Sequence, residues 1–214
     1  VAVVHEPPSE GGGSLGVDLS YRQNTSLVSS NISTTDNQGA RGDTWHMVVN
    51  GLWLLPRTDY FDTGSLITEM AFSHVERVTK HEELFKGEGY GGCPAGQDKH
   101  YGCATKNYVG LAVNFAPQWL GVFPGWNIST PMSVDYGVNG NAATGGGNEG
   151  KYTWKAGDKG TYDERVDVTL SYIGYGSERK YGDVAGVGKT VVGGTGDVGL
   201  TDRNWVSLTL STAF

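Results

Sequence analysis

The chain has 214 residues, of which 34 are glycine and 18% are charged, and its formal net charge is −7 at pH 7. A glycine share more than double the ordinary one favours an all-β chain, and the negative charge argues against a nucleic-acid partner. The absence of any run of eighteen apolar residues excludes a membrane-spanning helix but not a membrane β-barrel, whose strands carry apolar residues only at alternate positions.

Eight segments in chain order alternate between apolar and polar residues with the period of two that is typical of β-strands. Their first-face residues, mostly apolar, are Leu15, Val17, Leu19 and Tyr21; Trp45, Met47, Val49, Trp53 and Leu55; Leu66, Thr68, Met70 and Phe72; Val109, Leu111, Val113 and Phe115; Trp126, Ile128, Thr130, Met132, Val134 and Tyr136; Tyr152, Trp154 and Ala156; Val166, Val168, Leu170 and Tyr172; and Val206, Leu208 and Leu210. A helical period of 3.6 residues is nowhere sustained.

The last segment has the features of an outer-membrane assembly signal. Val206, Leu208, Leu210 and the terminal Phe214 lie on one side of it, although position 212 is a threonine where such signals usually carry an apolar residue. Lipid requires an apolar band closed by aromatic residues, and a barrel leaves no strand edge unpaired. We therefore expect this last strand to pair with the first one.

The connections between the eight segments differ in length according to their place in the chain. Those after the odd-numbered segments are long and polar, at about 25–43, 80–107, 139–148 and 177–201, whereas those after the even-numbered segments are short, at about 56–63, 120–125 and 158–162. Short turns at one rim and long loops at the other are typical of outer-membrane barrels. This pattern places the long loops outside the cell and the chain terminus on the periplasmic rim.

Two cysteines, Cys93 and Cys103, lie in the second long loop. A local disulfide is the first interpretation, and it implies an oxidising compartment beyond the inner membrane. Two free thiols are the alternative. Metal ligation by this pair together with His100 would fall short of a closed zinc site.

Aromatic residues gather near both ends of the predicted strands. Near the short turns are Trp53, Tyr60, Phe61, Trp119, Phe123, Trp126 and Tyr162, and near the opposite ends are Trp45, Tyr108, Tyr136, Tyr172 and Trp205. Two such belts are expected where rings meet lipid headgroups. We therefore predict an antiparallel transmembrane β-barrel. A soluble sandwich would instead gather its apolar face into a dry centre.

The opposite face of the segments carries charged residues of both signs. Its predicted lumen-lining residues are Asp18, Arg22, His46, Glu69, Asp135, Lys151, Lys155, Arg165, Asp167 and Arg203. Two interpretations stay open: a water-filled passage lined by charge, or a narrow interior in which carboxylates and cations pair.

Several stretches of the chain carry a family resemblance. They are EGYGGCPAGQDKHYGCATKNYVGLAVNFAPQW, WNISTPMSVDYGVNGN with the GGGNEG that follows, VDVTLSYIGY and DRNWVSLTLSTAF. Over roughly the second half of the chain, they resemble the C-terminal part of a large proteobacterial outer-membrane β-barrel family of unknown function (DUF1302-like). The resemblance implies that these residues are the last strands of a larger barrel with a transport role, often in uptake of hydrophobic or unusual carbon compounds. It implies no catalytic residues.

Two motifs of chemical interest are better assigned to surface loops and strand ends. Gly188, Lys189 and Thr190 lack the first glycine, the preceding strand and the following helix of a phosphate-binding loop. His74, Glu76, His81 and Glu82 are a minor metal candidate, and polar residues on the surface where a strand enters a loop are the commoner explanation. We expect no catalytic residues, no cofactor and no metal.

The sequence thus predicts an N-terminal connection or truncated loop over residues 1–13, followed by barrel strands over residues 14–214 in the bacterial outer membrane. The predicted function is a channel or transporter for small solutes, hydrophobic ones among them. The alternative is a closed eight-stranded structural or adhesive barrel, or a small outer-membrane enzyme. The expected partners are outer-membrane lipid, lipopolysaccharide, the barrel-assembly machinery and the N-terminal part of the same barrel.

Overall fold

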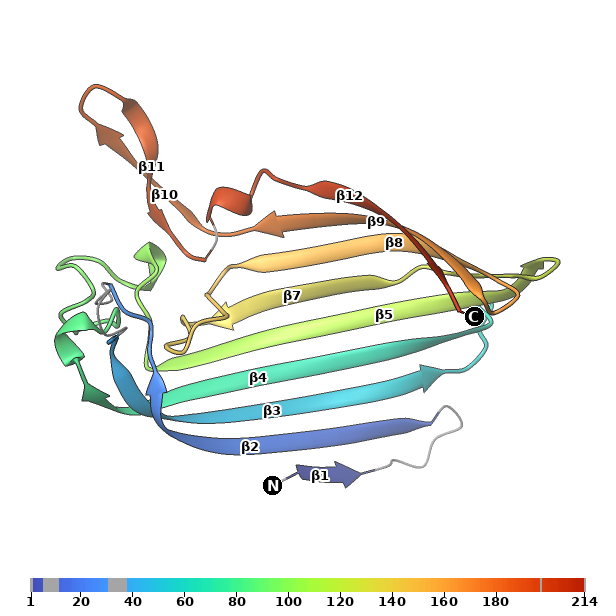
Figure 1. Ribbon diagram of the computed structural model, residues 1–214, viewed down its shortest axis with the longest axis horizontal. Coiled ribbons are helices and arrows are strands. Elements are labelled where there is room, and N and C mark those ends of the chain that lie inside the picture. The colour runs from blue at the N-terminus through green and yellow to red at the C-terminus, as the bar shows by residue number, and fades with distance from the viewer. Residues whose placement is uncertain (1, 6–11, 31–37, 197, 214) are drawn as a thin grey trace.

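A computed structural model describes residues 2–5, 12–30, 38–196 and 198–213, with the side chains of residues 2–5 left out. The described chain is all-β, with short 3₁₀ turns as its helical pieces (Figure 1). Its strands are β1 (Ala2–His5), β2 (Gly13–Ser26), β3 (Arg41–Leu55), β4 (Thr63–Lys80), β5 (Asn107–Phe123), β6 (Trp126–Ser129), β7 (Met132–Asn139), β8 (Tyr152–Tyr162), β9 (Val166–Gly176), β10 (Arg179–Val184), β11 (Gly188–Gly194) and β12 (Trp205–Thr212), and its 3₁₀ turns are η1 (Glu82–Leu84), η2 (Lys99–Tyr101) and η3 (Val198–Leu200). None of the described helices is of a length and apolarity that would span a bilayer.

The main sheet is an antiparallel meander in which each strand pairs with its neighbour in the chain. Its order is β1-β2-β3-β4-β5-β6-β8-β9-β12, with β7 continuing the line of β6 between β5 and β8. All eight predicted strands are present. The fifth is split into β6 and β7 at residues 130–131, where Pro131 has no backbone N–H to donate to the ladder.

The register gives the sheet two distinct faces, because residues opposite one another on paired strands point to the same side. One cross-strand row contains Val17, Val49, Met70, Leu111 and Tyr136, and the adjacent row contains Gly16, Asn50, Glu69, Ala112 and Asp135. The first row belongs to the apolar face and the second to the polar face. This division agrees with the faces predicted from the alternation.

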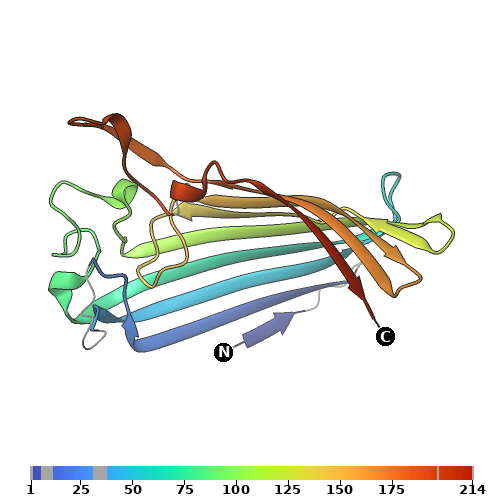
Figure 2. The ribbon, with the colours of Figure 1, turned by 45° about the horizontal axis from the view of Figure 1, so that its top comes forward.

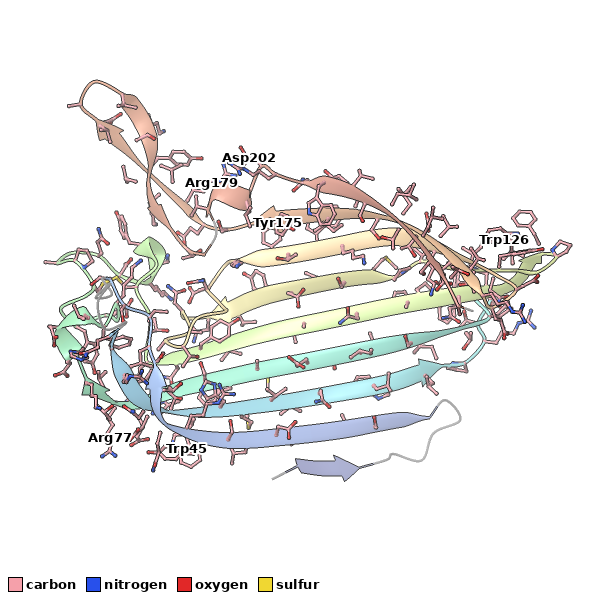
Figure 3. The ribbon with its side chains drawn as sticks, viewed as in Figure 1. Trp45, Arg77, Trp126, Tyr175, Arg179 and Asp202 are labelled. Carbon is pink, nitrogen blue, oxygen red and sulfur yellow. A yellow bond between two sulfur atoms is a disulfide. The ribbon has the colours of Figure 1, made fainter. Side chains whose placement is uncertain are left out.

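The apolar face of the sheet is exposed. Leu170, Leu208 and Leu210 expose 52%, 67% and 70% of their surface. On β2–β5 and β7 the exposed residues of this face include, at 39–51% each, Leu19, Trp45, Met70, Leu111 and Val134. A dry centre built from these residues, as in a soluble sandwich, is therefore not what the chain forms. The sheet curls into a trough with its polar face on the inside (Figures 2 and 3).

The buried apolar cluster lies in the long loops instead of against the sheet. Leu27, Ala40, Phe85, Ala104 and Ala143 form it together with Val75 at the loop end of β4. Val28, Val78 and Tyr90 pack against the cluster, and the rings of Phe85 and Tyr90 meet edge to face with centroids 4.8 Å apart. We call the described residues 27–30, 38–40, 81–106 and 140–151 the loop cap.

The loops and turns lie at opposite ends of the sheet, as predicted (Figure 1). Several boundaries differ from the prediction. The strand β5 continues to Phe123, so most of the connection predicted at 120–125 is strand. The strand β8 continues to Tyr162, so the connection predicted at 158–162 is strand and the turn lies at 163–165. The last long connection contains the hairpin β10–β11, which projects from the sheet, and residues 2–5 of the predicted N-terminal connection form β1.

Glycines opposite aromatic rings explain part of the unusual composition. On the apolar face Tyr152 lies over Gly176, Trp154 over Gly174 and Trp126 over Gly160. A Cβ atom on Gly160 would come within 2.9 Å of the Trp126 ring. The aromatic side chain of one strand thus covers the backbone that the glycine of its neighbour leaves bare.

The main sheet is open in the described part of the chain, where β12 pairs with β9 alone. The expected pairing of the last strand with the first is not formed, because β1 already occupies the β2 edge from Leu15 to Asp18. Both β1 and β12 run toward the short-turn end, since each is antiparallel to a neighbour that runs toward the loops.

Candidate functional site

The polar face holds most of the residues that the sequence predicts to line a lumen. Cross-strand pairing places Asp18, Arg22, His46, Glu69, Asp135, Lys155 and Asp167 on it. Lys151 lies just before β8. Two arginines differ from the prediction, because Arg165 is in the turn between β8 and β9 and Arg203 lies between η3 and β12. Neither therefore has a strand that fixes its side chain toward the inside.

A depression of about 340 Å³ opens on the polar face beneath the loop cap, bordered by Glu69, Tyr108, Asp135, Asn148 and Lys151 among others. Glu69 and Asp135 belong to one cross-strand row with Ala112 between them. Two strand spacings put their backbones about 9.6 Å apart, which leaves room for a small solute or several waters between the carboxylates.

The third long loop, residues 140–151, forms one wall of this depression. It is anchored to β7 by two backbone hydrogen bonds, from the Gly137 N–H to the Lys151 carbonyl (2.8 Å) and from the Gly150 N–H to the Gly137 carbonyl (2.9 Å). The Tyr108 ring fits against Gly110 on its own strand and Gly147 in the loop. A side chain at either glycine would occupy the position of the ring, so these glycines permit the loop to lie close to the sheet.

Two of the aromatic residues predicted to form a belt at the loop ends of the strands lie on the polar face instead. Tyr108 borders the depression, and the Trp205 Nε1–H donates to the Tyr175 hydroxyl on the polar face at 3.0 Å. Their positions along the chain suggested a belt, but strand parity decides the direction of a side chain. The Tyr21 and Trp45 rings do lie on the apolar face near the loops, with centroids 4.7 Å apart, and Trp126 lies at the opposite end of the sheet (Figure 3).

The polar face carries a charge pair near the short turns. Of its two residues, only Asp167 is among the predicted lumen-lining residues. Lys159 contacts Asp167 at 2.9 Å, and the Thr161 hydroxyl donates to the same carboxylate at 2.7 Å. Lys159 and Thr161 are absent from the predicted set because the short connection was expected at 158–162. The alternation that begins at Lys155 continues through both of them, and this is the signal that identifies their side of β8.

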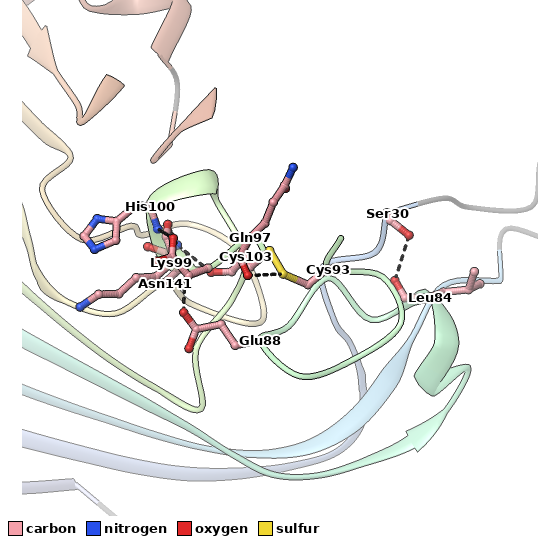
Figure 4. Close-up of a disulfide and its surroundings, with 10 residues drawn as sticks. Ser30, Leu84, Glu88, Cys93, Gln97, Lys99, His100, Cys103 and Asn141 are labelled. Atoms are coloured by element: carbon pink, nitrogen blue, oxygen red, sulfur yellow. Dashed lines mark hydrogen bonds between the residues drawn. A yellow bond between two sulfur atoms is a disulfide. The ribbon is translucent and has the colours of Figure 1, made fainter. Parts of the chain in front are cut away.

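Asn141 connects the loops of the cap, and its side chain is almost fully buried. Its Nδ2 donates to the carbonyls of Lys99 and Cys103, both at 2.7 Å, while its Oδ1 accepts from the Glu149 N–H at 3.0 Å (Figure 4). Its own backbone N–H donates to the Thr105 hydroxyl at 2.8 Å. One amide thus bonds to backbone groups of two loops: it is the side-chain partner of the Cys103 carbonyl and the Glu149 N–H, and it adds a second donor to the Lys99 carbonyl, which also accepts from the Gly102 N–H.

The predicted disulfide between Cys93 and Cys103 is present, with Cα atoms 5.8 Å apart (Figure 4). Cys103 is fully buried in the cap, and Cys93 is nearly so. The bond closes the loop segment around η2, which presents the Lys99 and Cys103 carbonyls to Asn141. The disulfide and the amide therefore support the same part of the cap.

A charge pair joins two loops within the cap. Lys99 Nζ contacts both oxygens of Glu149 at 2.8 Å, and the Gly140 N–H donates to the same carboxylate at 2.6 Å. The Lys99 ammonium, followed by the Gly140 N–H, lowers the pKa of the Glu149 carboxyl, and Glu149 in turn raises the pKa of Lys99.

A second carboxylate, Glu178, links η2 to the hairpin. It contacts His100 at 2.6 Å and Lys180 at 3.0 Å, and these two contacts, with His100 first, lower the pKa of its carboxyl. The base of β10–β11 is therefore attached to the cap by the contact of Glu178 with His100.

Within the described ranges, no three histidine, cysteine, aspartate or glutamate side chains are grouped so as to hold a metal ion. His74, the first residue of the minor metal candidate, contacts Asn107 at 2.7 Å on the next strand. Gly188–Thr190 begins β11 after a tight turn that follows β10, so a strand does precede it, contrary to the prediction, but a strand and not a helix follows.

The fold and the site define a class of protein: an antiparallel β-sheet with an exposed apolar face, a charged polar face and a folded cap of long loops. The chain belongs to the family described as a protein of unknown function, DUF1302, whose model matches residues 6–214. The match extends beyond the second half of the chain, on which the resemblance in the sequence rested. No curated protein and no solved structure matches the chain.

Proposed function

We propose that the chain forms part of a bacterial outer-membrane β-barrel that works as a channel or transporter for small solutes, hydrophobic ones among them. The observation that carries the proposal is the exposure of large apolar residues on the apolar face of every long strand, while the polar face carries the charges and the cap. Contiguous apolar surface of this extent is unfavourable in water and favourable against hydrocarbon.

A soluble sheet protein would have the opposite arrangement. Val134, Leu170 and Leu208 would then be gathered in the interior, whereas they are 40%, 52% and 67% exposed. The exposed residues instead form one continuous wall of neighbouring strands, with Trp126 and Tyr162 near the short turns and Tyr21 and Trp45 near the loops. This order of rings and aliphatic residues fits a bilayer with two interfaces.

The orientation follows from the loops. We place the loop cap outside the cell, since outer-membrane barrels have short periplasmic turns and long external loops, and the disulfide suits an oxidising compartment. The apolar wall would contact lipid and the cap would contact lipopolysaccharide. The barrel-assembly machinery would recognise β12 through Val206, Leu208 and Leu210; Phe214 lies outside the described residues.

The two open edges of the sheet support a barrel with further strands. A membrane sheet cannot leave a strand edge in lipid, because backbone groups there have no water to bind. Since β1 and β12 run in the same direction, direct contact between them would be parallel. An odd number of additional strands between them restores an antiparallel closure, and we propose that an N-terminal part of the same barrel supplies these strands.

The same edge argument disfavours the closed eight-stranded alternative. That form needs β12 on the edge of β2, where β1 is already paired from Leu15 to Asp18. The structural, adhesive and enzymatic functions attached to such a closed barrel lose their main geometric support with it.

Passage of solutes is proposed from the layout of the polar face. Toward the loop end it is bordered by Glu69, Asp135 and the loop of residues 140–151. Toward the short-turn end it is bordered by Lys155 and the Lys159–Asp167 pair. A solute would therefore meet first a narrowing with carboxylates and then a more basic stretch. Loop position and lining charge are the features by which such passages select solutes.

The test is electrical. The product of the full-length gene, refolded and inserted into planar bilayers, is expected to give ion-permeable openings, and Glu69→Gln with Asp135→Asn should lower its preference for cations. Asp163→Asn, in a short turn at the rim, is the matched control and should leave that preference unchanged. Absence of both openings and solute uptake in the assembled protein would contradict a channel.

A further inference from the structure

One polar pair interrupts the apolar face of the sheet. The Thr130 hydroxyl donates a hydrogen bond of 2.8 Å to Asp158 Oδ1, between the β6–β7 junction and β8. Asp158 is opposite Leu170, which is opposite Leu208, so the carboxyl group shares a row with two of the most exposed leucines. In the turn predicted at 158–162 a carboxylate would be unremarkable. On an apolar wall it requires a physical reason.

A shallow cavity adjoins this pair. It has a volume of about 330 Å³, and the side chains around it on the apolar face are Ala156, Leu170, Tyr172 and Val206 together with Thr130 and Asp158. Gly157 and Ser171 complete the lining; they are opposite one another on β8 and β9, and by the alternation of the strands their side-chain positions are on the polar face. The cavity is thus apolar over most of its lining and has a single polar end.

Asp158 retains capacity for a ligand. Its Oδ1 accepts from Thr130, and in the described part of the chain its Oδ2 has no hydrogen-bond donor. The other hydroxyl on the apolar side of the cavity is that of Tyr172, whose oxygen accepts from the Asn204 Nδ2 at 3.1 Å. A ligand in this cavity would therefore be held by apolar contact along its body and by one hydrogen bond at its head.

The position of the Asp158 carboxyl group along the membrane normal limits which ligands can reach it. Asp158 is four residues before Tyr162, whose ring packs on Trp126 at the short-turn end. Four residues span about 14 Å along a strand, or about 10 Å along the membrane normal at the usual tilt. The headgroup of a membrane lipid stays at the level of the aromatic rings, and only a small polar group is readily carried to the depth of Asp158.

We propose that the Thr130–Asp158 pair and the adjoining cavity form a lateral binding site, open to the membrane, for small-headed amphiphiles: molecules with an apolar chain and one terminal O–H or N–H donor. The proposal rests on the proposed function, because it requires the apolar face to lie in lipid. It adds a site on the outer wall, separate from the depression on the polar face.

The site is tested with the full-length protein in lipid vesicles, using a long-chain primary alcohol that carries a photoreactive diazirine near its hydroxyl. The matched probe is the corresponding alkane, which has the diazirine but no hydroxyl. After illumination, mass spectrometry locates the labels. The alcohol is expected to label β8, β9 and β12 around Ala156 and Val206 preferentially, whereas the alkane should label the whole apolar wall.

Asp158→Leu is expected to reduce alcohol labelling at the cavity about tenfold, the factor that corresponds to one lost hydrogen bond, and to leave alkane labelling unchanged. Asp158→Asn keeps an acceptor and should retain most of it. Because leucine is compatible with lipid, the alkane pattern and resistance to protease report that both variants are assembled.

Three other outcomes would overturn the proposal. Equal alcohol labelling in the wild type and in Asp158→Leu would show that the Thr130–Asp158 pair does not bind the hydroxyl of the alcohol, although the membrane assignment would stand. Asp158-dependent labelling by a diazirine phosphatidylethanolamine would show a lipid headgroup as the occupant. Failure of the alkane to label the apolar wall of the assembled protein would remove the membrane location and the proposed function with it.

Discussion

The strand sheet and the loop cap place their apolar residues in opposite ways. In the sheet, Leu170 and Leu208 are exposed on one face while Glu69, Asp135 and Lys159 lie on the other. In the cap, Leu27 and Phe85 are buried and the charged groups surround them. One chain thus contains two kinds of packing. The cap is built as for water, with its core inside, and we propose that the sheet is built for hydrocarbon, with its apolar side outside.

This contrast predicts that a charge has very different effects on the two faces of the sheet. Val134→Arg and Leu170→Arg are each expected to destabilise the inserted protein by about 2–4 kcal/mol, because the guanidinium would enter hydrocarbon. Their chain neighbours provide the matched controls: Ser133→Arg and Thr169→Arg, on the polar face, should alter conductance with little loss of assembly. Refolding into lipid vesicles measures both. Similar losses in the two sets would show the assignment of the faces to be wrong.

The cap should depend on its disulfide, and the sheet should not. Cys93→Ser with Cys103→Ser is expected to destabilise the cap by about 3 kcal/mol, the chain-entropy value for a loop of this length. Hydrogen exchange should then rise in residues 81–106 and 140–151 and stay low in β3, β4 and β5. A uniform rise over the sheet would contradict the independence of the two regions.

Removal of the buried amide should also affect only the cap. Asn141→Ala leaves the Glu149 N–H without its acceptor and the Cys103 carbonyl without its side-chain donor, while the Lys99 carbonyl keeps the Gly102 N–H; the expected cost is about 1–3 kcal/mol. Limited proteolysis of the loops measures the loss. Asn114→Ala, on the polar face of β5, serves as the control and should leave the protease sensitivity of the cap as in the wild type.

The smallest expected effect is a dependence of the cap on pH. The pKa of Glu149 and that of Glu178 lie below their ordinary value of 4.5 in the folded cap. Each carboxylate therefore contributes stability that is present above the unfolded value and is lost as the pH falls through the lower folded one. Cap protection against exchange should be constant from pH 7 to about 5 and decline below about 4.5. Glu149→Gln should weaken this decline, and an unchanged profile would show that the contact with Lys99 contributes nothing.

The sequence alone was sufficient for the parts of the fold that depend on local periodicity. The alternation in residues 166–172 and 206–210 identifies two strands and their apolar sides without any knowledge of neighbours, because successive side chains on a strand point to opposite faces. The lengths of the connections likewise predicted which end carries the loops. The disulfide could be predicted because its two cysteines, ten residues apart in one polar loop, are close enough along the chain to meet whatever the rest of the fold does.

The rest was decided by contacts between distant parts of the chain, on which local patterns carry no information. The end of β8 is set by its register with β9, so Asp158 and Lys159 are strand residues on opposite faces and not a turn. The cap depends on Asn141, Lys99 and Glu149 meeting across loops with no periodicity. The edge of β12 is open because β1 already pairs with β2, and β1 lies in a stretch that was predicted to be a connection. Alternation determines which side of a strand is apolar, but only tertiary structure determines which strands are adjacent and what each side encloses.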